Sequence, residues 1–218
     1  NWLWEKMGLE KSRHLVASRD DYGWEQEVTE AECKCTKEIK EYYYRCGAEC
    51  CLAYVLGMTD IHMDNVIAHG KYPVIIDTEF MFDRRIEVGT QRKNLQQNLM
   101  DTVVHTGLVP NGMGTMHVNV SVLNTCDEQR LSVKMPMVIH KGTSEMNISY
   151  HYPKLSHKKN MPIYEGKYIS FENYMNEFIS GFRRAYDCIK ADPEVLVGMC
   201  QPIMKKSVRY LFRNTQEY

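Results

Sequence analysis

Residues 59–65 (T-D-I-H-M-D-N) and the triplet Asp77-Thr78-Glu79 contain the side chains best suited to metal and phosphate chemistry. Asp60 and Asp77 supply carboxylates and Asn65 supplies an amide oxygen, and hard oxygen ligands of this kind suit Mg²⁺. Phosphoryl transfer needs one carboxylate to orient the attacking hydroxyl, and an Asn and an Asp to hold the metal on ATP. The pattern therefore predicts an ATP- and Mg²⁺-dependent, kinase-like phosphotransferase centre.

A predicted hairpin brings these side chains together. Residues 65–69 and 72–77 form two short runs rich in β-branched residues, joined by Gly70-Lys71. Because a hairpin returns to its starting side, Asp60, Asn65 and Asp77 are expected to converge at its open end. Protein kinases use the same order of helix, loop and hairpin, with H-R-D-x-x-x-x-N before D-F-G. Here Asp60 precedes His62, and Asp77 falls at the D-F-G position.

A long helix is expected before the hairpin, over residues 36–56. Its apolar positions Ile39, Tyr43, Cys46, Cys50 and Tyr54 recur at helical spacing. The threonine at position 36 is a candidate N-cap, and the glycine at position 57 is a natural stop.

The remaining segments predict an α+β, mainly helical domain. We expect a short amphipathic helix at the N-terminus, a hinge-like turn at residues 20–24, and a short helix at 99–105. Residues 118–123 and 131–138 are expected to be extended, and 142–160 to form a surface loop or hairpin. The chain is expected to be helical again from residue 170 to its end, with Val208, Leu211 and Phe212 on the last helix.

Composition excludes several classes of protein. The chain has 218 residues, 44% of them apolar and 25% charged, which is typical of a globular domain. The formal net charge of −1 gives no strong overall field toward nucleic acid. No apolar run reaches the ~18–20 residues of a membrane span, and no signal peptide is visible, so a cytoplasmic location is expected. The eight cysteines lack the spacing of a zinc site and are interpreted as reduced thiols.

Residues 54–82 resemble the dehydratase domain of type II lanthipeptide synthetases (LanM-like). The family pattern there is close to T-D-x-H-x-E-N-x-I-A-x-G-x-x-P-x-x-I-D-x-E-T. The flanks agree at residues 21–24 (D-Y-G-W), at 43–47 (Y-x-R-x-G), at 106–110 (T-G-L-x-P) and at 209–218, so the resemblance covers essentially the whole chain. Two positions depart from the pattern, since Asp64 replaces a glutamate and Phe80 stands where the family usually has threonine.

The resemblance implies a two-step reaction on a ribosomally made precursor peptide, in which ATP phosphorylates Ser or Thr and the phosphate is then eliminated. It implies that Asp60 orients or deprotonates the substrate hydroxyl with His62 beside it. Asn65 and Asp77 would bind Mg²⁺, with Glu79 in or near that shell. The match also assigns elimination roles to three further residues, Arg209, Thr215 and Thr106.

The domain organisation that the resemblance implies is a kinase-like large lobe over residues 25–218, preceded at 1–24 by a hinge segment that ends the small lobe. Most of the small lobe and the zinc-dependent cyclase domain are expected to be absent from this chain and to be its partners in a longer polypeptide. Two alternatives remain open: a kinase-like phosphotransferase acting on another substrate, and a non-catalytic peptide-binding pseudoenzyme.

Overall fold

The computed structural model describes residues 1–11, 15–20, 22–78, 80–82, 102–110, 118–124, 128–155 and 159–205. The order of elements is α1 (Trp2–Lys6), β1 (Val16–Ser18), β2 (Gly23–Glu25), α2 (Thr36–Val55), β3 (Val66–His69), β4 (Tyr72–Ile75) and the 3₁₀ turn η1 (Val103–Thr106). Strands β5 (Gln129–Arg130), β6 (Met135–Ile139), β7 (Asn147–His151), β8 (Lys154–Leu155), β9 (Ile163–Tyr164) and β10 (Lys167–Tyr168) follow. The 3₁₀ turn η2 (Phe171–Asn173) then leads into α4 (Met175–Ala191) and α5 (Pro193–Met204).

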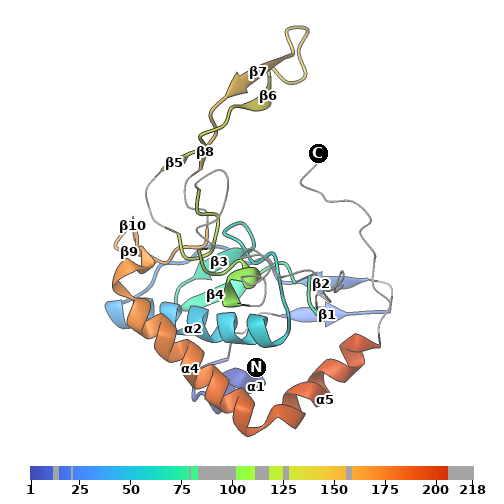
Figure 1. The fold of residues 1–218 in the computed structure, drawn as a ribbon, viewed down its shortest axis with the longest axis vertical. Helices are drawn as coiled ribbons and strands as arrows, with labels where there is room; N and C mark the ends of the chain where they lie inside the picture. Colours follow the sequence, from blue (N-terminus) through green and yellow to red (C-terminus); the bar gives the residue numbers. More distant parts are fainter. Residues whose placement is uncertain are drawn as a thin grey trace, which may run out of the picture.

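The fold is mixed helix and strand, and its base is the crossing of α2 and α4 (Figure 1). Gly47 and Gly181 allow this close approach. A Cβ at position 47 would overlap the backbone of Phe178, and a Cβ at position 181 would overlap the backbone of Tyr44. The two helices therefore touch through backbone as well as side chains, which fixes α2 as the platform for the rest of the molecule.

The long helix is confirmed, with two differences of detail. Thr36 is its first helical residue and Cys35 precedes it as the cap residue, without a side-chain capping bond. Instead the carboxylate of Glu38 accepts a hydrogen bond of 2.7 Å from the backbone N–H of Lys34. Tyr54, expected on the buried stripe, is 46% exposed. Gly57 ends the turn after the helix with a left-handed φ of 59°.

Helix α2 is buried on two sides because it separates two apolar clusters. The first contains Ile39, Cys46 and Cys50 from α2, together with Val66 from β3 and Phe178 from α4. The second lies on the other side and joins α1, α4 and α5, with Leu3, Trp4, Ala48, Cys51, Ala185, Leu196 and Cys200 among its members. Helix α1, within the segment expected to end a small lobe, therefore packs in the same core as α2.

In the described part of the chain, each sheet contains two strands. Strands β3 and β4 form the predicted antiparallel hairpin, with Val66 opposite Ile75 and His69 opposite Tyr72. Gly70 takes a left-handed φ of 57° in its turn. Strands β1 and β2 form a further hairpin over the segment expected to be only a turn, so that interpretation was incomplete. The described part of the chain contains ten short strands, more strand than a mainly helical domain implies.

The run predicted to be extended at 131–138 and the first part of the surface loop or hairpin predicted at 142–160 together form a projecting two-stranded arm. Strands β6 and β7 pair over five residues, from Met135 opposite His151 to Ile139 opposite Asn147. Strands β5 and β8 pair at its base. Figure 1 shows this arm, residues 128–155, extending away from the helical base. Of the helix predicted over residues 99–105, the described residues form only the 3₁₀ turn η1, and residues 99–101 lie outside the described part. The predicted last helix around Val208 to Phe212 also lies outside the described residues.

Candidate functional site

The loop between α2 and β3 is anchored by every second residue. Ile61 and Met63 are buried, at 0% and 3% exposure. Their backbone N–H groups donate to Thr106 O and Val120 O, both at 2.9 Å. Because alternate side chains are fixed in the core, the polar ones between them face outward. The side chains of Asp60 and His62 are 54% and 32% exposed.

Gly107 makes the close support under this loop possible. It adopts φ +83°, and a Cβ there would lie 2.9 Å from Ile61 O and 3.1 Å from Ile61 N. A side chain at position 107 would therefore push the loop outward. This support comes from residues more than forty positions further along the chain, and only the T-G-L motif hinted at it.

Asn65 is the link between the loop and the hairpin. Its backbone carbonyl accepts a hydrogen bond of 3.0 Å from the N–H of Ile76, the residue before Asp77. Its side-chain Nδ2 donates to Asp60 O at 2.9 Å. This bond assigns the orientation of the amide and leaves Oδ1 as the end that can coordinate a cation. The structure thus places Asp60, Asn65 and Asp77 around the open end of the hairpin.

Asp60 adopts the left-handed conformation, with φ 62°. Asp tolerates this region better than most residues, at a cost of about 1 kcal/mol. The carbonyl oxygen of this strained residue accepts the hydrogen bond from the side-chain amide of Asn65. The same turn brings the exposed Asp60 carboxylate to the side of the loop occupied by His62.

The ring of His62 is oriented by its own loop. The backbone N–H of Asp64 lies 3.2 Å from Nδ1, so Nδ1 accepts and the ring hydrogen is assigned to Nε2. Nε2 lies 3.8 Å from Asp60 Oδ1, and Nδ1 lies 3.7 Å from Asp64 Oδ2. The contact of 3.4 Å between Asn65 Nδ2 and His62 Nε2 then joins two donors and adds no hydrogen bond. His62 therefore presents its Nε2–H toward the Asp60 carboxylate.

Thr106 supports the site from inside the protein. It is 2% exposed, and its hydroxyl donates to Val103 O at 2.7 Å and accepts from the N–H of Leu108 at 3.2 Å. Its backbone carbonyl is the acceptor for Ile61 N–H. These contacts favour a positioning role for Thr106, whereas its expected role in elimination stays a prediction.

Three of the expected site residues, Glu79, Arg209 and Thr215, lie outside the described residues. Phe80, one of the two departures from the family pattern, contributes through its backbone. Its carbonyl accepts from the N–H of Thr59 at 3.0 Å, which ties the chain after β4 to the start of the loop.

The donor set fits Mg²⁺, because one or two carboxylates, an amide oxygen and ATP phosphates are its usual ligands in phosphotransferases. Asp77 and Asn65 Oδ1 are the candidate donors. Among the described residues, no cluster of three or more His, Cys, Asp or Glu side chains is arranged to hold a metal. Asn65 is not of these types and Glu79 is outside the described part, so the expected ligand set stays a prediction.

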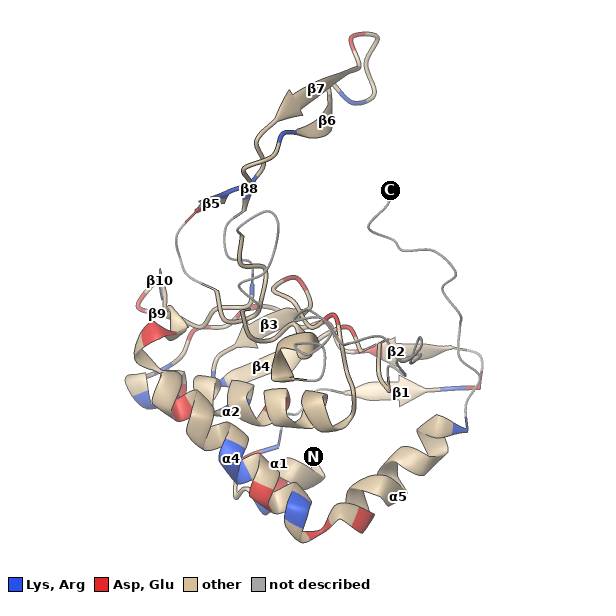
Figure 2. Ribbon diagram, viewed as in Figure 1, with Lys and Arg blue, Asp and Glu red and all other residues tan. Residues whose placement is uncertain are grey.

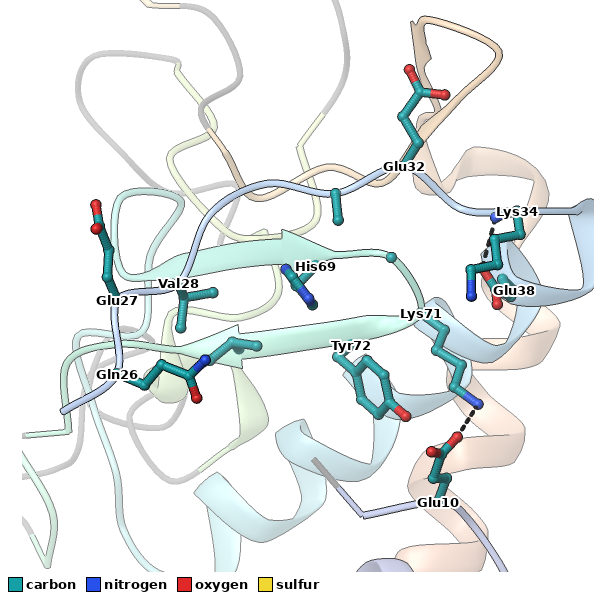
Figure 3. Close-up of a pocket in the computed structure, with 13 residues that line it drawn as sticks. Glu10, Gln26, Glu27, Val28, Glu32, Lys34, Glu38, His69, Lys71 and Tyr72 are labelled. Carbon is teal, nitrogen blue, oxygen red and sulfur yellow. Dashed lines mark hydrogen bonds and ion pairs between the residues drawn. The ribbon is translucent and has the colours of Figure 1, made fainter. Parts of the chain in front are cut away.

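A separate cavity of about 450 Å³ lies along the same hairpin, from its turn to Val74 and residues 26–28 (Figure 3). His69, Lys71 and Tyr72 line it from the turn, and Glu32 and Lys34 line it from the segment before α2. Lys71 Nζ pairs with Glu10 at 2.9 Å and with Glu41 at 3.3 Å. Sequence reasoning did not find this cavity, because its walls come from three separated segments.

The cysteines within the described residues are free thiols, and all except Cys35 are buried. Burial raises the pKa of Cys33 and Cys50 to about 12 and that of Cys51 to about 11. Buried thiols with raised pKa values are poor nucleophiles and poor metal ligands at neutral pH. They serve as small apolar groups in the two clusters.

Similar sequences identify the family to which this chain belongs. A model of the family described as "Domain of unknown function (DUF4135)" matches residues 1–218, and the chain belongs to this family. The chain is also 28% identical, over 221 aligned residues, to the lacticin 481/lactococcin biosynthesis protein LcnDR2 of Lactococcus lactis subsp. lactis. The alignment covers 94% of this chain and 23% of that relative, so the chain spans about a quarter of its length. In the described part of the chain no helix has both the length and the apolar character to cross a bilayer.

Proposed function

We propose that this chain carries the catalytic loop of an ATP- and Mg²⁺-dependent enzyme of lanthipeptide biosynthesis, which dehydrates Ser and Thr in a precursor peptide. The supporting observation is the open end of the hairpin, where Asn65 joins the Asp60 loop to the strand that ends before Asp77. The similarity to a protein named for lacticin 481 and lactococcin biosynthesis supports the proposed class of product.

In the proposed first step, Asp60 accepts the proton of the substrate hydroxyl while that oxygen forms a bond to the γ-phosphorus of ATP. The bond from the γ-phosphorus to the β,γ-bridging oxygen breaks, and ADP leaves. Mg²⁺, when bound by Asn65 and Asp77, neutralises charge on the phosphate oxygens. His62 lies beside the Asp60 carboxylate, with Nε2 3.8 Å from Oδ1, and the exposure of both side chains leaves room for a peptide.

In the proposed second step, a base removes the Cα proton of the phosphorylated residue, the Cβ–O bond breaks, and phosphate leaves. The product is dehydroalanine from Ser or dehydrobutyrine from Thr. Arg209 is proposed to bind the leaving phosphate, since a guanidinium can form two parallel hydrogen bonds to it. Thr215 is proposed to act with Arg209. Residues 25–218 are proposed as the large lobe of a kinase-like fold, with residues 1–24 ending the small lobe.

The test uses the full-length native protein with ATP, Mg²⁺ and its precursor peptide, followed by intact-mass measurement. Loss of water from the peptide is the expected result. A phosphoryl group that is gained and never lost would instead show a kinase, and an unchanged mass would show a binding protein.

Two variants assign the roles within this experiment. Asp77→Ala is expected to abolish both phosphorylation and dehydration, because the metal loses a ligand. Arg209→Ala is expected to accumulate phosphorylated peptide. Lys37→Ala, an exposed residue in the first turn of α2, serves as the control. Full activity of Asp77→Ala would reject the proposed metal site.

A further inference from the structure

The projecting arm, residues 128–155, has features that the proposed chemistry does not use. Strands β6 and β7 form a sheet of two, so neither outer edge pairs with another strand in the described part of the chain. Unpaired N–H and C=O groups on a strand edge are a template for another extended chain. A two-stranded ribbon is also marginally stable alone, which favours an additional strand.

One face of the arm is apolar and exposed. The cross-strand pair Val138 and Ile148 lies beside the pair Pro136 and Tyr150, and alternation along the strands puts these four side chains on one face. Val138, Ile148 and Tyr150 are 43%, 59% and 63% exposed. A strand added at either edge could cover part of this face with every second side chain.

The arm is more basic than the rest of the chain. It carries four cationic side chains and two carboxylates, whereas the whole chain has a net charge of −1. Figure 2 shows the cationic residues along β5, beside β6 and in the loop after β6. The cations are Arg130, Lys134, Lys141 and Lys154, and the carboxylates are Glu128 and Glu145. An acidic extended segment therefore complements the arm, whereas a second copy of the arm would bring like charges together.

The base of the arm is hydrogen-bonded to the segment that supports the catalytic loop. The side chain of Gln129 in β5 accepts from Asn119 N at 2.5 Å and donates to Asn119 O at 3.0 Å. The next residue, Val120, accepts the N–H of Met63 in the catalytic loop. His62 forms a bridge with Ser121 in the same segment. The base of the arm is therefore connected to the Asp60 loop through residues 119–121.

We propose that the arm is a docking strand for the peptide substrate, which adds to the β6–β7 edge through an extended, acidic stretch outside the residue that reacts. This proposal rests on the proposed function for the identity of the peptide. The recognition itself needs no ATP and no Mg²⁺, so it can be measured separately from the chemistry.

The experiment measures binding to the full chain by fluorescence anisotropy, without nucleotide or metal. One probe is a labelled synthetic peptide of about twelve residues in which valine or isoleucine alternates with glutamate, a length that covers a typical strand. The second probe has lysine in place of each glutamate. The acidic peptide is expected to bind more tightly by about ten-fold or more, and less tightly at high salt.

Charge reversal on the arm has a matched control elsewhere. Lys134→Glu with Lys141→Glu is expected to weaken binding of the acidic peptide by about ten-fold or more. Lys190→Glu with Lys37→Glu is expected to leave the affinity within about two-fold, because these lysines lie on α4 and α2. The two double variants are matched because each reverses the charge of one lysine that lies over a tyrosine ring. Lys134 lies 5.6 Å from the centre of the Tyr152 ring, and Lys190 lies 5.9 Å from the centre of the Tyr186 ring.

The apolar face is tested with Val138→Thr and Ile148→Thr together, which keep residues that favour strands. This variant is expected to weaken binding by about five-fold. Equal binding of the two probes, or equal losses in the arm and control variants, would overturn the proposal. So would a dimer of the chain, seen in sedimentation, that these threonine substitutions abolish. If the acidic peptide binds as expected while a precursor peptide is never modified, the proposed function fails and the docking strand stands.

Discussion

The two ends of the β3–β4 hairpin are held in place by different means. At the turn end, the guanidinium of Arg45, 1% exposed, lies between the rings of Trp4 and Tyr72, at 5.1 and 4.7 Å from their centroids. It also donates to Glu41 Oε1 at 2.7 Å and to Glu10 O at 2.9 Å. At the open end, exposed carboxylates sit on a loop that is held by backbone hydrogen bonds from residues 106 and 120.

Because of this difference, substitutions at the two ends of the hairpin are expected to have different effects, on folding at the turn end and on the proposed site at the open end. The turn end is anchored through side chains to α1 and α2, so a change there is expected to act on the folding of the whole domain. The open end is anchored through backbone, and the side chains of Asp60 and His62 there are partly exposed. Changes under the open end are therefore expected to act on the geometry of the site more than on the fold.

The strongest test of this division is Arg45→Met. The substitution keeps an unbranched, flexible side chain but leaves the Glu41 carboxylate without its closest partner and removes the cation that lies over two rings. We expect a loss of about 3 kcal/mol in the free energy of unfolding, measured with urea. The peptide-modifying activity per folded molecule is expected to change little.

The double variant Arg45→Met with Glu41→Gln is the control for the buried charge. It is expected to recover part of the loss, since it removes the carboxylate that the single variant leaves unpaired. If the single variant is as stable as the native chain, the turn end does not anchor the domain.

The next test is Gly107→Ala, under the open end. The added methyl group would meet the backbone of Ile61 at 2.9 Å, and position 107 has φ +83°. We expect a loss of about 2 kcal/mol in stability together with a larger loss of activity, because the loop that carries Asp60 must move. Gly198→Ala in α5 is the control, since a Cβ there meets nothing within 4 Å. A Gly107→Ala variant with native activity would remove the basis of the comparison.

A smaller effect is expected from Thr106→Val. The change removes the hydroxyl that accepts from Leu108 N–H and donates to Val103 O, while it keeps the shape of the side chain. We expect a loss of about 1–2 kcal/mol in unfolding experiments. Thr106→Ser keeps the hydroxyl and is expected to retain more stability than Thr106→Val. If activity falls far more than stability in Thr106→Val and is retained in Thr106→Ser, the hydroxyl acts in the chemistry as the resemblance implies.

The elements that could be predicted from the sequence were those built from local contacts. The spacing of Ile39 to Cys50 was enough to predict α2, and the β-branched runs around Gly70-Lys71 were enough to predict the hairpin and its open end. The exposure of Tyr54 could not be predicted, because periodicity shows which positions share a face but not where the neighbouring elements end.

The support of the loop that carries Asp60 was likewise not predictable. The backbone N–H groups of Ile61 and Met63 donate to the carbonyl groups of residues 106 and 120. No local sequence pattern indicates that these backbone segments meet. The position of Arg45 depends on rings from residues 4 and 72. Candidate site residues could be identified by type and motif, but the contacts that position them depend on parts of the chain distant in sequence.

Glu49, one helical turn after Arg45, gives the smallest predicted effect and extends the comparison to pH. Burial raises the pKa of its carboxyl group from 4.5 to about 7, and Arg45 opposes this shift. Since the folded pKa is raised, the stability contributed by the protonated group is fully present below pH 4.5 and is lost as the pH rises through about 7. We expect Glu49→Gln to be more stable than the native chain by about 1 kcal/mol at pH 8 and equal to it near pH 4, in urea unfolding at both pH values. In the Arg45→Met background the gain at pH 8 should be larger, because one of the positive charges that lower the pKa of the Glu49 carboxyl group is gone. A gain that is unchanged in that background would mean that Arg45 stabilises the turn end without acting on Glu49.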